Sequence, residues 1–124
     1  WGPAFTGSAG YWSNLDDMME FLRWHLGFVS VPSIDPIVDE TVNNRLGWGV
    51  TYNWDGSGET LVSKNGAANG YQAYIGYLRG ADKGVVILLA EPTYADPQAF
   101  GEYILEISAV GTELKELVAF RVSG

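Results

Sequence analysis

The chain of 124 residues contains no cysteine, which excludes disulfide bonds and thiolate metal ligands. It contains a single histidine, His25, and its carboxylates are too dispersed to form a coordination set with that residue. Basic residues are also scarce, with 7 Lys and Arg against 15 Asp and Glu, for a net charge of -8. A negative surface repels nucleic-acid phosphate. We therefore predict no metal site, no cofactor and no nucleic-acid partner.

Long apolar runs are missing as well. No stretch approaches the roughly 20 apolar residues that a transmembrane helix needs, so we expect no membrane span. Trp1-Gly2-Pro3 has neither the basic nor the apolar character of a signal region, and a start without methionine suggests a processed product or a fragment. The compartment stays open. A hydrophobic content of 47% can build one core, so residues 1–124 are expected to form a single domain or a fragment of one.

Hydrophobic periodicity divides what remains into helices and strands. Asn14 precedes apolar residues at helical spacing, which predicts a capped helix that Gly27 ends. A second helix begins at Asp96-Pro97 and carries Phe100, Tyr103, Ile104 and Ile107 as its expected packing face. We expect helices at 15–26 and 97–108, a loop at 28–45, and strands at 47–54, 60–65, 71–79 and 84–90.

This order of elements is typical of the α+β class, with an antiparallel sheet flanked by helices. Both helices are expected to pack together on one face of the sheet. The run from Val85 to Ala90 is apolar on both faces, which favours a central position in the sheet.

The segment with most chemical information is Lys64-Asn65-Gly66-Ala67-Ala68-Asn69-Gly70-Tyr71. Glycine beside a strand end lets a backbone approach a ligand closely, and a neighbouring lysine offers a point charge for a carboxylate or phosphate. Taken alone, a Lys-x-Gly sequence is more often an ordinary turn.

The segment resembles the K-T-G-x-T-N-G-F element of class C β-lactamases and related D-Ala-D-Ala peptidases. Lys64, Gly66, Asn69 and Gly70 match, and Tyr71 replaces another aromatic residue, whereas Asn65 and Ala68 stand where the family often has threonine. The order of the surrounding segments is also similar to that family, including its glycine-rich turn, its "GLGW" strand, the strands after the motif and its C-terminal helix. The matching stretches are 7–13, 16–18, 46–49, 72–77, 84–90 and 94–105.

This resemblance implies the C-terminal portion of a serine β-lactamase, penicillin-binding-protein-like peptidase or esterase. In such enzymes Lys64 would favour the substrate carboxylate, Asn65 would hydrogen-bond it, and the Ala67 N–H would donate to the oxyanion, with Gly66 and Asn69 lining the site. The implied substrate is a β-lactam, a D-amino-acid peptide or an ester, and the implied compartment is periplasmic or extracellular.

The resemblance also shows what these residues do not supply. No serine has lysine three positions later and no Tyr-x-Asn occurs, so the nucleophile is expected on a missing N-terminal portion bearing Ser-x-x-Lys, and the segment alone is expected to be inactive. The alternative is a non-catalytic α+β module that binds a ligand or a partner. We interpret Tyr94-Ala95-Asp96 as a helix entry, His25 as structural, and the aromatic stripe of residues 48–54 as sheet packing.

Overall fold

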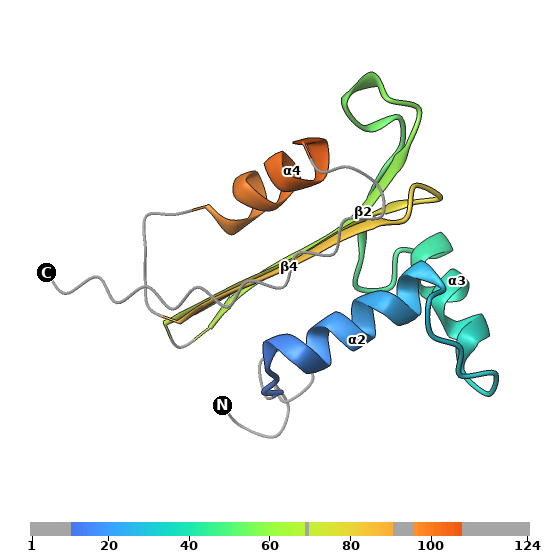
Figure 1. Ribbon diagram of the computed structural model, residues 1–124, viewed down its shortest axis with the longest axis horizontal. Coiled ribbons are helices and arrows are strands. Elements are labelled where there is room, and N and C mark those ends of the chain that lie inside the picture. Colours follow the sequence, from blue (N-terminus) through green and yellow to red (C-terminus); the bar gives the residue numbers. More distant parts are fainter. Residues whose placement is uncertain (1–10, 69, 91–95, 108–124) are drawn as a thin grey trace, which may run out of the picture.

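A computed structural model describes residues 11–68, 70–90 and 96–107. The chain forms α+β architecture in which a sheet lies between helices (Figure 1). The helices are α2 (Leu15–Leu26), α3 (Asp35–Asn43) and α4 (Pro97–Ile107), with a short 3-10 turn η2 (Trp54–Gly56). The strands are β1 (Gly49–Thr51), β2 (Thr60–Ala68), β3 (Tyr71–Arg79) and β4 (Lys83–Ala90). The predicted fold class, an α+β fold with an antiparallel sheet flanked by helices, is confirmed.

The sheet is an antiparallel meander in the order β1-β2-β3-β4. β2 and β3 pair along their whole length, from Thr60 opposite Arg79 to Ala68 opposite Tyr71. β1 is much shorter and pairs only with Leu61 to Ser63 of β2. The second half of β2 therefore extends beyond β1.

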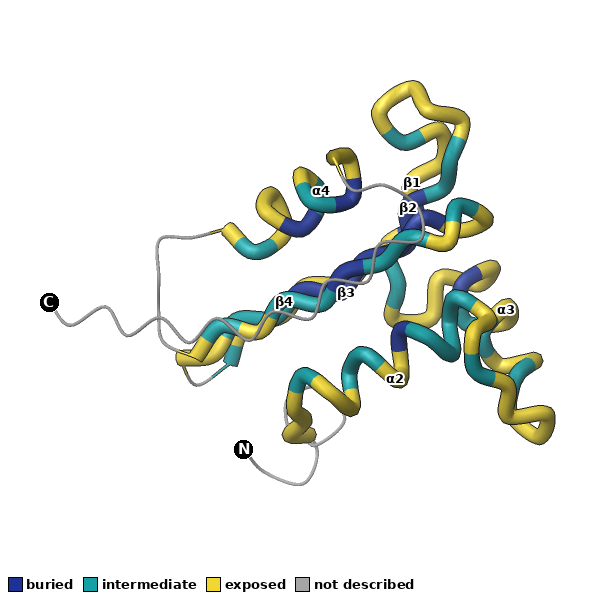
Figure 2. Tube along the Cα trace, in the orientation of Figure 1, coloured by how far each residue is buried: buried dark blue, intermediate teal, exposed yellow. Residues whose placement is uncertain are grey.

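Each face of the sheet has its own core. Leu22 of α2 packs with Val62, Ile75 and Tyr77 on one face, whereas Leu105 of α4 packs with Tyr74 and other residues on the opposite face. Neighbouring residues of a strand point to opposite faces, so β3 contributes to both cores. Figure 2 shows the buried residues concentrated along the strands between the two helices.

The expectation that the two long helices share one face is wrong. α2 and α4 both contact β3 and β4, but they lie on opposite sides of the sheet (Figure 1). Leu22 of α2 lies against Gly84, and the backbone of Gly101 in α4 lies against the Tyr74 ring. The central position predicted for 84–90 is also wrong, since among the described strands β4 is at the edge. The coverage of both its faces by helices explains why β4 is apolar on both.

Of the four residues predicted to form the packing face of α4, only Ile104 packs against the core. Gly101 and Leu105 are its buried residues, whereas Phe100, Tyr103 and Ile107 are exposed. A Cβ atom at Gly101 would lie 2.4 Å from the Tyr74 ring. The helix therefore approaches the sheet through its glycine, which turns the larger apolar residues outward.

Two element boundaries also differ from expectation. The predicted 28–45 loop contains α3. The proline at the start of α3 is compatible with the first turn of a helix as well as with a loop. The predicted 47–54 strand is limited to Gly49–Thr51, because Asn53 and Asp55 adopt left-handed conformations with φ of 48° and 51°. In contrast, α2 begins and ends as predicted: Asn14 Oδ1 accepts the Asp17 N–H at 2.9 Å, and Gly27 has φ of 83°.

None of the helices in the described ranges is long and apolar enough to cross a membrane.

Candidate functional site

The Lys-x-Gly segment lies within β2 and not after it. The predicted strand ended at Asn65, but β2 continues through Gly66 and Ala67 to Ala68. Because β1 pairs only with Leu61 to Ser63, residues 64–68 have no described strand on that side. Backbone N–H groups of an antiparallel strand point alternately to its two sides. The edge of β2 along 64–68 therefore presents backbone groups that no described strand pairs, and an extended ligand could bind to them.

Three cross-strand rows form the face of the sheet at this end, on the side of α2. Lys64 lies opposite Ile75, Gly66 opposite Ala73, and Ala68 opposite Tyr71. β4 completes these rows with Val86, Leu88 and Ala90 respectively. We call the part of this surface beyond α2 the open face; its residues are Lys64, Gly66, Ala68, Tyr71, Ala73, Leu88 and Ala90.

The open face is not covered by α2. The hairpin end of the sheet runs past the first turn of that helix (Figure 1). Leu88 is 40% exposed although its neighbour Val86 packs against the α2 core. The remaining floor of this surface consists of small residues, Gly66, Ala68 and Ala73. A shallow apolar surface thus begins where the helix ends.

Lys64 lies at the inner border of the open face. Its side chain is exposed, and no residue that the structure describes pairs with its ammonium group. Two of the described arginines, in contrast, are engaged: Arg79 pairs with Asp39, and the Arg45 guanidinium lies over the Tyr52 ring at 5.8 Å. In a chain of net charge -8, an exposed lysine without a described carboxylate partner can bind an external anion.

Gly66 has no requirement for glycine in the described structure. Its φ lies outside the left-handed region, and no described atom lies within 4 Å of the position that a Cβ would occupy. Glycine inside a strand lowers stability because it loses more backbone freedom on folding. A glycine that neither the backbone nor the packing requires is typical of a place where a ligand or another chain approaches closely.

The other predicted residues lie along the same edge but on different faces. Asn65 and Ala67 alternate with Lys64 and Gly66, so their side chains point toward the α4 side of the sheet. The Asn65 amide donates to Gln98 Oε1 at 3.3 Å, at the beginning of α4. Lys64 and Asn65 can thus contact one ligand only at the strand edge, where both faces meet. Asn69 lies outside the described residues.

Two aromatic side chains lie at the outer end of the open face. Trp12, just ahead of α2, makes an edge-on contact with Tyr71 at a centroid distance of 5.5 Å. Trp12 is 75% exposed and Tyr71 is 48% exposed. In the sequence, Tyr71 and Trp12 stand out only as parts of two family-like segments, because their proximity depends on how α2 lies on the sheet.

A separate concavity lies at the opposite end of the sheet. It has a volume of about 410 Å³ and lies between the end of α2, α3 and the β3–β4 turn. Asp35, one of its carboxylates, is already engaged: it accepts hydrogen bonds from Trp24 Nε1 at 2.7 Å, Ser30 Oγ at 2.7 Å and the Val31 N–H at 2.8 Å. The Ser30 hydrogen bond is the largest cause that lowers the pKa of Asp35.

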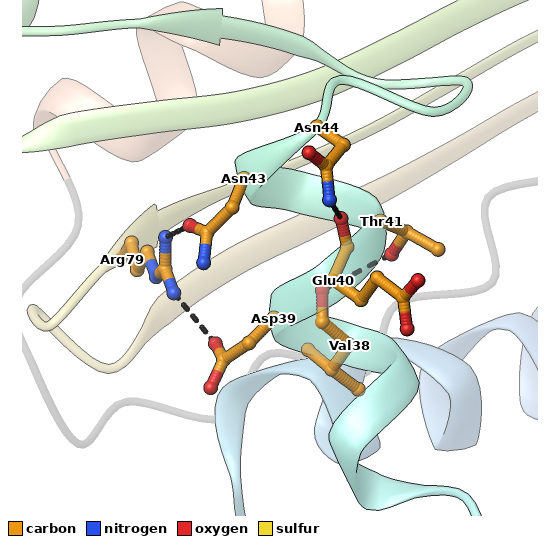
Figure 3. Close-up of polar contacts among 7 residues, drawn as sticks. All are labelled: Val38, Asp39, Glu40, Thr41, Asn43, Asn44 and Arg79. Carbon is orange, nitrogen blue, oxygen red and sulfur yellow. Dashed lines mark hydrogen bonds and ion pairs between the residues drawn. The ribbon is translucent and has the colours of Figure 1, made fainter.

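The charged groups on the other wall of this concavity hold α3 against the sheet. Arg79 at the end of β3 donates to Asn43 Oδ1 at 2.9 Å and pairs with Asp39, both on α3 (Figure 3). Because Asp35, Asp39 and Arg79 already bind within the chain, this concavity is mainly a structural junction.

His25 also borders this concavity. Its Nδ1 lies 2.9 Å from the Phe21 carbonyl oxygen, and its ring lies among those of Phe21, Trp48 and Tyr77. Burial lowers the pKa of His25, so the neutral ring is favoured in the fold. This environment supports the structural interpretation of His25.

Three other features bear on the predicted sites. The described residues contain no group of three or more His, Cys, Asp or Glu able to hold a metal ion. Asp96 accepts the Gln98 and Ala99 N–H groups at 3.0 and 3.2 Å and so caps α4, while Tyr94 and Ala95 lie outside the described residues. Of the aromatic stripe, Trp48 and Trp54 pack against the two cores, whereas Tyr52 is exposed.

The chain was compared with protein families, curated proteins and solved structures, and none of them matches it.

Proposed function

We propose that this chain supplies the substrate-binding wall of a serine hydrolase of the β-lactamase, D-Ala-D-Ala carboxypeptidase or esterase type. The observation that carries this proposal is Gly66. It is a strand glycine with an ordinary φ and free space at its Cβ position, two residues from a lysine that no described residue engages. The glycine allows close approach, and the lysine supplies the charge that holds a carboxylate.

In this proposal the substrate lies along the edge of β2. Lys64 binds its carboxylate, Asn65 contributes an amide hydrogen bond, and the Ala67 N–H donates to the oxyanion that forms during acyl transfer. A backbone donor in a strand costs little reorganisation, because the sheet fixes its direction before the substrate arrives. Asn65 in place of a hydroxyl residue changes the reach of its hydrogen bond, so peptide and ester bonds are as compatible with the site as a β-lactam.

The nucleophile belongs to a polypeptide portion outside the described residues. Ser13 donates to the adjacent Asn14 carbonyl oxygen, and Ser63 lies within β2 opposite Gly76. Neither serine has a lysine three positions later. Without an adjacent base a serine hydroxyl is a weak nucleophile. The residues of this chain are proposed to hold the substrate, and a Ser-x-x-Lys serine to attack it.

The experiment is a titration of the isotope-labelled chain with N-acetylglycine, followed by NMR. Residues 64–68 are expected to shift, and Lys64→Met should weaken binding at least about tenfold by removing the charge. Lys83→Met is the matched control, because it also removes a lysine. Lys83 lies at the start of β4, opposite Leu78, and is not part of the open face. Equal effects of the two substitutions, or shifts away from residues 64–68, would contradict the proposal.

A second candidate function is a non-catalytic module that binds a partner. The outward stripe of Phe100, Tyr103 and Ile107 on α4 favours it, since exposed apolar residues at one-turn spacing suit a helix-mediated contact. Substitution of Tyr103 would then weaken partner binding, whereas Lys64→Met would leave it unchanged.

A further inference from the structure

The open face has chemically different ends. Lys64 stands at one end, and Tyr71 with Trp12 stands at the other. Lys64 and Ala68, which pairs with Tyr71, are four strand positions apart, or about 13 Å at about 3.3 Å per residue. A small molecule with an anionic group and an apolar group can span this distance.

The surface between these ends is smooth. Gly66 and Ala73 face one another across β2 and β3, and Leu88 continues the row on β4. With no side chain on Gly66 and only a methyl group on Ala73, a flat group can lie directly against the backbone of the sheet. Leu88, 40% exposed, adds apolar contact. This floor favours a planar, apolar group over a heavily hydrated one.

The aromatic pair stays largely uncovered although it has an internal contact. Trp12 and Tyr71 meet edge to face, and both rings are exposed. An edge-on pair leaves ring faces available for a third ring. Exposed aromatic residues beside an open strand edge thus provide an apolar end to the same surface.

We infer that the substrate of this site is an aryl-bearing carboxylate: its carboxylate binds Lys64, and its aryl group lies over Gly66 and Ala73 against Trp12 and Tyr71. This inference rests on the proposed function, and it narrows the substrate class from peptides and esters in general to those with an aromatic acyl or side group. The charge of Lys64 and the apolar floor together select such an occupant over a neutral or wholly polar one.

The experiment compares two carboxylates that differ in the aryl group, N-(phenylacetyl)glycine and N-acetylglycine, by NMR titration of the chain. The aryl compound is expected to bind about fivefold more tightly, the range that one aromatic contact provides. Trp12→Ala should abolish this preference, and Trp12→Phe should keep most of it. Tyr52→Ala should retain all of it, because Tyr52 is an exposed aromatic residue that follows β1, away from the open face.

The outcomes separate the two proposals. If the two compounds bind equally, or Trp12→Ala keeps the preference, the aryl inference is overturned. The proposed function then stands provided that Lys64→Met still weakens N-acetylglycine. If Lys64→Met affects neither compound, both proposals fail. Shifts of the open face that depend on protein concentration alone would assign it to a second copy of the chain and would also overturn the inference.

Discussion

At the scale of single residues, Gly66 and Gly101 have different roles. Gly101 lets α4 approach the sheet, because a Cβ atom there would collide with the Tyr74 ring. Gly66 has no such neighbour among the described atoms and an ordinary backbone conformation. Packing among the described residues thus accounts for the first glycine but not for the second.

This contrast predicts opposite responses to alanine. Gly66→Ala should keep or raise the free energy of unfolding, by up to about 1 kcal/mol, because it restricts the unfolded chain. Gly101→Ala should lower it by about 1–3 kcal/mol through overpacking against Tyr74. Urea unfolding of the two variants measures both effects. A loss of stability in Gly66→Ala would mean that the fold itself requires this glycine.

His25 predicts a pH dependence of stability. Burial lowers its folded-state pKa below the ordinary 6.5, so the unfolded chain binds a proton at a higher pH than the folded chain does. The free energy of unfolding is therefore highest above pH 6.5, where His25 is neutral in both states. It declines as the pH falls below 6.5 and stops declining once the folded state is protonated as well. His25→Phe should remove this component, as measured by urea midpoints at pH 7.5 and 5.5. Identical pH dependence in both proteins would contradict a half-buried ring that the fold keeps neutral.

Whether the structural role of each residue could be predicted depended on how far apart in the sequence its interacting residues lie. Asn14 and Gly27 were predictable because a helix cap is a local pattern of a few residues. The role of Gly66 was only partly predictable, because Gly66 and Gly70 together look like a turn while β3 pairing extends the strand through Gly66. Trp12 was missed because its contact with Tyr71 joins positions far apart in sequence.

At the scale of elements, α4 shows why apolar spacing alone did not identify a packing face. Phe100, Tyr103, Ile104 and Ile107 satisfy the helical period. Of these only Ile104 packs against the sheet core, together with Gly101 and Leu105, because the large Tyr74 ring on β3 fits beneath a glycine. The choice between two apolar stripes therefore depended on the shape of the opposing surface, which the helix sequence does not contain.

Alanine substitutions on the two stripes should distinguish them. Leu105→Ala is expected to lower the free energy of unfolding by about 2–5 kcal/mol, since its side chain is almost fully buried. Tyr103→Ala, on the exposed stripe, should change it by no more than about 0.5 kcal/mol. Chemical denaturation gives both values. The reverse order of effects would restore the packing face that the period alone predicts.

At the scale of the whole molecule, the two ends of the sheet differ in how far their polar groups are engaged within the chain. The end near α3 is closed by the hydrogen bonds of Asp35 and the Arg79 contacts (Figure 3). The hairpin end presents Lys64, the edge of β2 that no described strand pairs, and the aromatic residues Trp12 and Tyr71. The α+β class and the strands were predictable from local periods, whereas the separation of α2 and α4 onto two faces was not. A strand that is apolar on both faces is compatible with a central position in the sheet. It is equally compatible with an edge position whose two faces are both covered by helices.

The proposed hydrolase predicts a kinetic effect of Lys64 in any polypeptide that combines this chain with its nucleophile. Lys64→Ala should lower kcat/KM by at least about tenfold, which corresponds to about 1.4 kcal/mol of transition-state binding. Lys83→Ala, at the start of β4, should leave kcat/KM unchanged. Ester hydrolysis by the two variants provides the measurement. Equal rates in Lys64→Ala and the unsubstituted protein would exclude Lys64 from the site.

The most direct test of the central claim is acyl labelling with a fluorescent penicillin or an activated ester phosphonate, followed by mass spectrometry. The isolated chain should gain no mass, because its residues bind substrate but do not attack it. A longer polypeptide that joins this chain to a portion bearing a Ser-x-x-Lys element, if one is encoded ahead of Trp1, should be labelled on the serine of that element. Labelling of the isolated chain at Ser13 or Ser63, or no labelling of the longer polypeptide, would contradict the account.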